Sequence, residues 1–457
     1  MPLSKSIFKA YDIRGIVKDE LTPEIVELIG QAIGSESIAK GERGVVVGRD
    51  GRLSGIELMQ ALKSGLKKSG CHVVDIGMVP TPLVYYATYT KAATSGVMIT
   101  GSHNPPEYNG FKIMIAGETL SGERIEALYQ RIQNNDFCSG HGTSTRVDIE
   151  DDYIERIASD IKLEKPLHIV VDAGNGVAGN IAPKLFEQLG AKVTKLFCLV
   201  DGNFPNHHPD PSKLHNLEDI IKEVKNTGAD MGFAFDGDGD RLGLIDNKGG
   251  VIWADRQMIL YARDILKRNA GAKIVFDVKC SSQLPKDIIE HGGEAIMSRT
   301  GHSFIKAKLK ATGAALGGEM SGHIFFKERW YGFDDALYTG ARLLEILSKT
   351  DKTCAQVFAD LPDSINTPEI NIHFDEQGQQ FNAMDKLAKN IDFPQAKITT
   401  IDGVRVDYDN GWGLVRPSNT MPCLVLRFEA NDEKTLKEIQ QKFRIWLEGN
   451  NISTQDF

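Results

Sequence analysis

Short apolar runs and amphipathic stretches follow one another in the same order three times along the chain. Each unit opens with an apolar run that ends at an aspartate, at 44–50, 168–172 and 273–277. An amphipathic stretch, a glycine and a second apolar run come next, at 56–76, 181–197 and 283–298. Strand-length apolar runs that alternate with helical periods are typical of parallel α/β units, and a glycine after a helix fits a left-handed C-cap. The pattern predicts three homologous α/β domains with mixed sheets.

The chain after the third unit has a different pattern. Apolar runs at 371–374, 403–406 and 424–428 predict strands, and an amphipathic stretch at 433–447 predicts a terminal helix. This order favours a smaller α+β domain. The sequence thus predicts four domains around a central cleft, at 1–148, 149–250, 251–364 and 365–457. Open α/β sheets bind ligands at the carboxyl ends of their strands, so the polar loops there are the candidate sites.

Composition and charge limit the partners of the protein. Its 457 residues are too many for one core, and 41% hydrophobic with 25% charged residues is an ordinary soluble profile. A net charge of −9 disfavours nucleic acid, because binding a phosphate backbone needs a basic face. The six cysteines form no Cys-x-x-Cys motif, and we find neither a signal peptide nor an apolar run of the roughly 18 residues that span a membrane. We expect a cytoplasmic protein, monomeric or weakly dimeric, with no membrane partner.

The most charged loop between two predicted strands reads DGDGDR at 236–241. Its three carboxylates, on Asp236, Asp238 and Asp240, would repel one another strongly without a cation. Mg²⁺ takes oxygen ligands and often binds few protein carboxylates together with a phosphate oxygen. An EF-hand needs Gly at the sixth position and Glu at the twelfth, where this chain has Arg241 and Asn247. The loop therefore predicts a magnesium site, with a solvated acidic turn as the alternative.

Three further loops carry candidate chemistry. TGSHNP at 100–105 suits a reactive serine, because Gly101 relaxes the backbone and His103 lies beside Ser102. GGEMSGH at 317–323 offers donors and acceptors for sugar hydroxyls, and RPSNT at 416–420 combines a guanidinium with two hydroxyls, as a phosphate clamp does. Each of these loops, taken alone, is also compatible with an ordinary hydrogen-bonded turn.

The segment GNGVAG at 174–179 matches the G-x-G-x-x-G pattern of dinucleotide-binding loops. Asp201 lies about where a ribose-binding acid could follow. The equivalent loops of the other two units lack these glycines, and close strand–helix packing alone can require them. We therefore favour a tight strand–helix turn over a dinucleotide site, and the chain has no Gly-Lys-Ser/Thr for a P-loop.

Together with FKAYDIRG at 8–15, the four loops resemble the α-D-phosphohexomutase superfamily, and GEMSGH most resembles its bacterial phosphomannomutase/phosphoglucomutase branch. The resemblance implies that Ser102 is phosphorylated and holds Mg²⁺ together with Asp236, Asp238 and Asp240. It implies that five side chains surround the transferring group, namely Arg14, His103, Lys112, Arg241 and His323. It also implies substrate-binding roles for Tyr11, Lys279, His302, Glu319, Ser321, Arg416, Ser418, Asn419 and Thr420.

The implied activity is a mutase that interconverts hexose 1-phosphate and hexose 6-phosphate, with mannose or glucose as the sugar. The phosphoserine would give its phosphoryl group to the substrate, and a hexose 1,6-bisphosphate would serve as intermediate and activator. Either Lys112 or His323 could act as general base, and the lysine would need a lowered pKa. Glucosamine phosphate as the substrate, a phosphosugar phosphatase and a silent phosphosugar-binding protein remain the alternatives.

Overall fold

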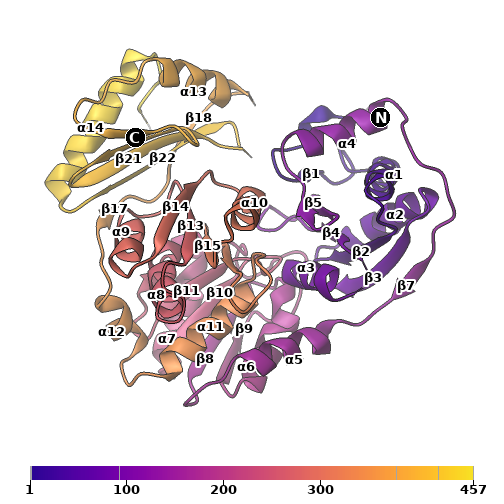
Figure 1. The fold of residues 1–457 in the computed structure, drawn as a ribbon, viewed down its shortest axis with the longest axis horizontal. Coiled ribbons are helices and arrows are strands. Elements are labelled where there is room, and N and C mark those ends of the chain that lie inside the picture. Colours follow the sequence, from indigo (N-terminus) through magenta and orange to yellow (C-terminus); the bar gives the residue numbers. More distant parts are fainter. Residues whose placement is uncertain (1–2, 92, 377, 420, 456) are drawn as a thin grey trace.

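The computed structural model describes residues 3–91, 93–376, 378–419, 421–455 and 457. Figure 1 shows four groups of elements in chain order, with the indigo N-terminal group and the yellow C-terminal group on opposite sides of the two central ones. No helix in the described residues is long and apolar enough to cross a membrane.

The first sheet has the strand order β1-β5-β4-β2-β3-β7, with β6 beside β5. Strand β2 is parallel to β3 and β4, whereas β5 is antiparallel to β4 and β1. Val45 and Val47 of β2 face α1 and α2, and Val46 faces α3, as alternation along a strand requires. The elements are η1 (Lys5–Ile7), β1 (Ile13–Ile16), α1 (Pro23–Ala39), β2 (Gly44–Arg49), α2 (Gly55–Lys68), β3 (His72–Met78), α3 (Thr81–Thr90), β4 (Ser95–Ile99), β5 (Tyr108–Ile115), β6 (Glu118–Thr119), α4 (Glu123–Gln133) and β7 (Ser144–Arg146).

The second and third sheets have the orders β12-β11-β10-β8-β9 and β14-β13-β15-β16. The second group contains α5 (Glu150–Asp160), β8 (His168–Asp172), η2 (Val177–Asn180), α6 (Ala182–Gln188), β9 (Lys192–Leu196), η3 (Leu214–Leu217), α7 (Glu218–Thr227), β10 (Met231–Phe235), β11 (Leu242–Asp246) and β12 (Val251–Ile252). The third contains α8 (Ala254–Leu266), β13 (Lys273–Asp277), α9 (Gln283–Glu290), β14 (Glu294–Ser298), α10 (His302–Thr312), β15 (Leu316–Gly318), β16 (Ile324–Phe326), α11 (Ala336–Ser348) and α12 (Cys354–Ala359).

One strand plan is common to the three sheets. Orders β3-β2-β4-β5, β9-β8-β10-β11 and β14-β13-β15-β16 correspond, and in each the last strand is antiparallel to its neighbour. The glycine that follows the first helix of the second unit, Gly190, has φ 95°, which fits the predicted left-handed cap. The predicted three-fold α/β repeat with mixed sheets is confirmed. The candidate loops at Ser102, the aspartates and Glu319 each join the third and fourth strands of their plan.

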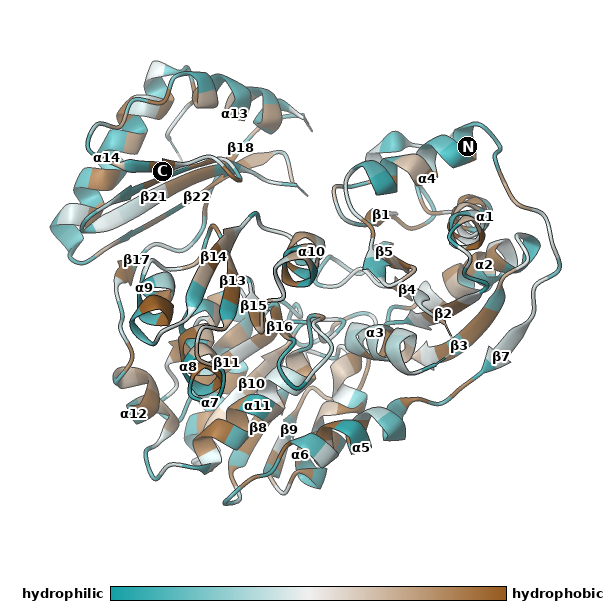
Figure 2. Cartoon of the chain, viewed as in Figure 1, coloured by the Kyte–Doolittle hydropathy of each residue, from teal (hydrophilic) through white to brown (hydrophobic). Residues whose placement is uncertain are grey.

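The C-terminal group is an antiparallel sheet covered by two helices, which confirms the predicted α+β class. Its strand order is β17-β22-β21-β20-β19, and β18 also pairs with β22. Ile439, Phe443 and Leu447 of α14 are buried against it, and Figure 2 shows apolar strands here beneath helices of mixed hydropathy. The elements are β17 (Ile365–Asn366), β18 (Ile370–His373), α13 (Gln379–Lys389), β19 (Lys397–Thr399), β20 (Val404–Tyr408), β21 (Gly411–Pro417), β22 (Cys423–Ala430) and α14 (Glu433–Gly449).

Candidate active site

Ser102 lies in the β4–β5 loop, directly opposite the aspartate loop of the second sheet. Its Oγ donates to Asp236 Oδ2 at 3.1 Å and lies 3.2 Å from His103 Nδ1. The φ angle of Ser102 is 50°, in the left-handed region that non-glycine residues uncommonly adopt. Burial, with Arg241 and Arg14 nearby, holds the pKa of His103 well below its ordinary value. Near neutral pH the imidazole is therefore uncharged.

A buried ion pair that the sequence analysis missed fixes the backbone of this loop. Asp50 Oδ2 lies 3.3 Å from Arg52 Nε and accepts hydrogen bonds from Thr100 Oγ1 at 2.8 Å and the Gly101 amide at 3.2 Å. The Arg52 guanidinium donates to four loop carbonyls, those of Ser102, Asn104, Pro105 and Tyr108. The sequence offered one sign of this pair, since Asp50 ends the first repeated strand run. Its partner, Arg52, belongs to no repeated pattern and so was not recognised.

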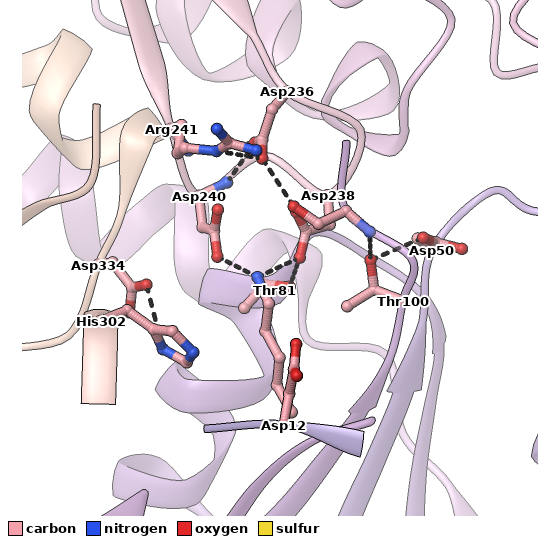
Figure 3. Close-up of polar contacts among 12 residues, drawn as sticks. Asp12, Asp50, Thr81, Thr100, Asp236, Asp238, Asp240, Arg241, His302 and Asp334 are labelled. Atoms are coloured by element: carbon pink, nitrogen blue, oxygen red, sulfur yellow. Dashed lines mark hydrogen bonds and ion pairs between the residues drawn. The ribbon is translucent and has the colours of Figure 1, made fainter. Parts of the chain in front are cut away.

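The three aspartates of the β10–β11 loop converge, and each side chain is fully buried. One oxygen from each lies within 4.8 Å of the others, and Figure 3 shows the three carboxylates gathered on one side of Thr81. Asp236 Oδ1 accepts the amides of Asp240 and Arg241, both at 3.1 Å, which curls the loop. Buried oxygens without a hydrogen-bond partner in the described chain, Asp238 Oδ1 and Asp240 Oδ1, fit a hard cation such as Mg²⁺.

Lys112 of β5 reaches into this group from the first domain. Its Nζ donates to Asp238 Oδ2 at 2.7 Å and to Asp240 Oδ2, while Thr81 Oγ1 donates to Asp238 Oδ2 at 2.5 Å. Burial lowers the pKa of Lys112, but the carboxylates of Asp238 and Asp240 outweigh burial and raise it above its ordinary value. Lys112 is therefore a cation that pairs with two of the three aspartates.

Metal binding to the aspartates should release protons. Burial is the larger cause and repulsion among the carboxylates the smaller one, and together they raise the pKa of Asp236 and of Asp240 to about 7. A raised pKa means that protons are held up to about pH 7, so Mg²⁺ must displace them below that pH. We expect proton release on Mg²⁺ binding at pH 6 and almost none at pH 9, with affinity rising across this range. Calorimetry in two buffers of different ionisation enthalpy measures the number of protons released. Equal proton release at pH 6 and pH 9 would contradict the pKa shift.

Two arginines add positive charge at the same place. Arg14 of β1 donates through Nη2 to Asp12 Oδ2 at 2.6 Å and through Nη1 to Asn104 Oδ1. Arg241 Nε donates to Asp236 Oδ2 at 2.9 Å. Each guanidinium is thus held by a carboxylate next to the Ser102 loop, where it can offset the charge of a phosphoryl group.

His323 and His302 lie on the side of the aspartates that belongs to the third domain. The two rings stack with centroids 5.9 Å apart, and Tyr11 meets His302 edge-on at 5.3 Å. Asp334, which the sequence analysis missed, lies between them, with Oδ2 3.1 Å from His323 Nδ1 and 3.7 Å from His302 Nδ1. Lys306 Nζ donates to Asp334 Oδ1 at 2.9 Å. This places His302 and Tyr11 close to the residues predicted to surround the transferring group.

A second cluster joins the third and fourth domains. Lys279 Nζ donates to Glu369 Oε1 at 2.7 Å, and Arg416 Nε donates to Asp402 Oδ2 at 3.0 Å. Burial opposes the charge on Glu369, but Lys279 outweighs it and lowers the pKa of that carboxyl to about 2. Asp402 also accepts the amide of Thr300 at 2.9 Å. Burial lowers the pKa of Lys279 and of Arg416, but Glu369 and Asp402 outweigh it and raise both, so both side chains are charged. The buried Arg416 Nη2 has no hydrogen-bond partner in the described chain.

The remaining residues predicted to contact the substrate lie in the loops at 317–323 and 416–420. Glu319 accepts the Gly301 amide at 2.5 Å, and burial raises the pKa of its carboxyl to about 7. Ser321 is half-buried beside it. Ser418 is buried and accepts the Met421 amide at 3.2 Å, and Asn419 is half-buried. Thr420 lies outside the described residues.

The glycine-rich segment 174–179 forms a tight turn against the aspartate loop. Gly174 and Asn175 have φ angles of 49° and 61°, and the Val177 amide donates to the carbonyl of Gly237 at 3.1 Å. A Cβ on Gly176 would lie 2.9 Å from the same carbonyl. The turn therefore supports the aspartate loop, in agreement with the favoured interpretation.

Comparison with known proteins agrees with this architecture. Models of phosphoglucomutase/phosphomannomutase match the chain in order, with alpha/beta/alpha domains I, II and III at 5–139, 151–250 and 253–365 and the C-terminal domain at 369–445. A phosphomannomutase/phosphoglucomutase of Pseudomonas putida is 57% identical over 445 residues, which cover 97% of this chain and 96% of the relative. A phosphoglucomutase of Neisseria gonorrhoeae is 52% identical over 451 residues, 98% of each chain.

A crystal structure of a phosphoglucomutase/phosphomannomutase family protein from Burkholderia thailandensis has a TM-score of 0.95 and 50% identity, with both chains covered completely. These matches bear out the predicted enzyme class and fold class. The chain belongs to the phosphoglucomutase/phosphomannomutase family of the α-D-phosphohexomutase superfamily.

Proposed function

We propose that this enzyme interconverts hexose 1-phosphates and hexose 6-phosphates, of mannose, glucose or both, through a phosphoserine at Ser102. The observation that carries the proposal is the position of Ser102 Oγ, 3.1 Å from Asp236 Oδ2, the same oxygen that the buried Arg241 binds at 2.9 Å. The Ser102 phosphoryl group passes to the free hydroxyl of the substrate, which gives a hexose 1,6-bisphosphate. This intermediate then reverses its orientation in the site, and its other phosphoryl group returns to Ser102.

Phosphoryl transfer depends mainly on alignment and on neutralisation of charge. Asp236, Asp238 and Asp240 would hold Mg²⁺, whose chemistry when bound is to offset the charge on the phosphoryl oxygens. Arg14 and Arg241 supply further positive charge from the two sides of the Ser102 loop. Lys112, which reaches the same group of carboxylates from β5, would bind phosphate oxygens as a further cation.

His323 is the better candidate for general base. Its Nδ1 is turned toward Asp334, at 3.1 Å, which leaves Nε2 as the nitrogen that can take the proton of the attacking sugar hydroxyl. An imidazole nitrogen can serve as acceptor and, once protonated, as donor, so this side chain can both take and return the proton. Glu319 would accept hydrogen bonds from the sugar hydroxyls, and Ser321 could donate to them as well as accept from them.

Arg416→Ala should raise KM by about tenfold or more and lower kcat much less, since Arg416 would bind the phosphate that does not react. Steady-state kinetics at saturating Mg²⁺ measures both constants. Arg416→Lys is the matched variant, because it keeps the charge and loses the bidentate fork, and it should lie between wild type and alanine. Thermal unfolding of each variant separates lost binding from instability caused by the unpaired Asp402. An unchanged KM in a folded Arg416→Ala protein would contradict the clamp.

A phosphorus NMR time course tests the proposed function. The protein is mixed with mannose 1-phosphate, Mg²⁺ and a trace of hexose 1,6-bisphosphate. Growth of a 6-phosphate resonance without inorganic phosphate is the expected result, and repetition with glucose 1-phosphate and glucosamine 1-phosphate ranks the sugars. Growth of inorganic phosphate would mean a phosphatase, and no change with any of the sugars would contradict the proposal.

A further inference from the structure

A second group of metal-type ligands lies next to the aspartate triad. Three buried atoms, Asp240 Oδ1, His323 Nδ1 and Asp334 Oδ2, have no hydrogen-bond partner within the described residues. The Asp240 and Asp334 side chains are 0% exposed and that of His323 is 13% exposed. Buried polar atoms are ordinarily satisfied, so three orphans that face one another require an explanation.

Their spacing suits a cation. His323 Nδ1 lies 3.1 Å from Asp334 Oδ2 and 3.5 Å from Asp240 Oδ1, and all three atoms lie within 4.8 Å of one another. A tetrahedral ion with bonds of about 2.1 Å separates its ligand atoms by about 3.4 Å. The nitrogen is thus within contact distance of both carboxylates without hydrogen-bond geometry to either.

We propose that Asp240, His323 and Asp334 form a second divalent-cation site, selective for Zn²⁺-like ions over Mg²⁺. One imidazole nitrogen with two carboxylate oxygens is a donor set for zinc, whereas magnesium prefers oxygen alone. The opposite oxygens are already bound, Asp240 Oδ2 by Lys112 and Asp334 Oδ1 by Lys306 at 2.9 Å. These lysines orient the two carboxylates and leave Asp334 Oδ2 free, while Asp240 Oδ1 is shared with the aspartate triad.

Zinc at this site would oppose the proposed catalysis. Asp240 belongs to both sites, and two divalent ions close together repel, so Zn²⁺ affinity should fall as Mg²⁺ increases. Zinc bound to Nδ1 would also hinder the imidazole of His323 from taking a proton, so that Zn²⁺ should inhibit turnover. This inhibition rests on the proposed function, whereas the binding does not.

Zn²⁺ titration, followed with a chromophoric competitor, tests the site directly in protein that contains a fixed excess of Mg²⁺. His323→Gln should lower Zn²⁺ affinity by about tenfold or more, because it removes one of three ligands, and should leave Mg²⁺ affinity within about twofold. Asp334→Asn should act in the same direction. His215→Gln, at an exposed histidine outside the cluster, is the matched control and should bind Zn²⁺ as wild type does.

Mg²⁺ affinity is the folding control, because a variant that retains it keeps the aspartate loop intact. If Asp334→Asn folds poorly, its lost Mg²⁺ affinity will show this, and His323→Gln still tests the site. Wild-type Zn²⁺ affinity in His323→Gln would overturn the proposal and would mean that zinc binds the triad alone. Absence of Zn²⁺ binding by the wild-type protein in Mg²⁺ would overturn it as well. Neither binding result depends on whether the enzyme is a mutase, so failure of this site and failure of the proposed function are distinguishable.

Discussion

Ser102→Ala is expected to lower mutase turnover by about 10⁴-fold or more, the range that loss of a catalytic nucleophile costs. The hydroxyl that carries the phosphoryl group is removed, and no other described hydroxyl donates to Asp236 Oδ2. The rate is measured with hexose 1-phosphate in the presence of hexose 1,6-bisphosphate. Affinity for the sugar phosphate should change little, because the Arg416 and Lys279 cluster is untouched.

Thr100→Ser is the matched control for this variant. It keeps the hydroxyl that binds Asp50 Oδ2 and the Ser102 amide, so the loop should hold its shape and turnover should stay within about threefold. Near-normal turnover by a purified Ser102→Ala protein would contradict the assignment of the nucleophile.

Arg52→Leu is expected to have the second largest effect. It leaves Asp50 buried without its cation, which costs about 3–5 kcal/mol of the free energy of unfolding. It also frees four loop carbonyls, so the Ser102 loop loses its fixed geometry and turnover should fall by about 10²-fold. Urea unfolding and steady-state kinetics measure the two effects on the same protein.

Arg52→Lys is the variant that separates charge from geometry. Lysine keeps a partner for Asp50 but cannot reach four carbonyls, so most stability should return while turnover stays low. Equal recovery of stability and turnover would contradict a positioning role for the guanidinium fork. Wild-type stability in Arg52→Leu would contradict the importance of the pair.

The repeated strands were predictable because their apolar runs are bounded on both sides. Strands β8 and β13 have the predicted limits, His168–Asp172 and Lys273–Asp277, since an aspartate ends each run. Strand β21, Gly411–Pro417, was not predicted. It contains two glycines and a buried tryptophan, Trp412, that packs with Val278 of the third domain, so its pattern follows an interface and not one sheet face.

The site was predictable as motifs and not as contacts. Loops with several chemical groups in a few residues, such as that of Asp236, are recognisable without a structure. Asp334, Asp402 and Glu369 are single acidic residues whose partners come from other elements, at separations of up to about a hundred residues, as for Thr300 and Asp402. No local period encodes such contacts, because the fold alone brings them together.

Transfer of a phosphoryl group to and from Ser102 is the most direct test of the account. Dephosphorylated protein is incubated with Mg²⁺ and hexose 1,6-bisphosphate, and mass spectrometry locates the modification before and after addition of hexose 6-phosphate. The account predicts one phosphoryl group on Ser102 that the added sugar phosphate removes, with hexose 1,6-bisphosphate formed and no inorganic phosphate released. A phosphoryl group on another residue, none at all, or release as inorganic phosphate would contradict it.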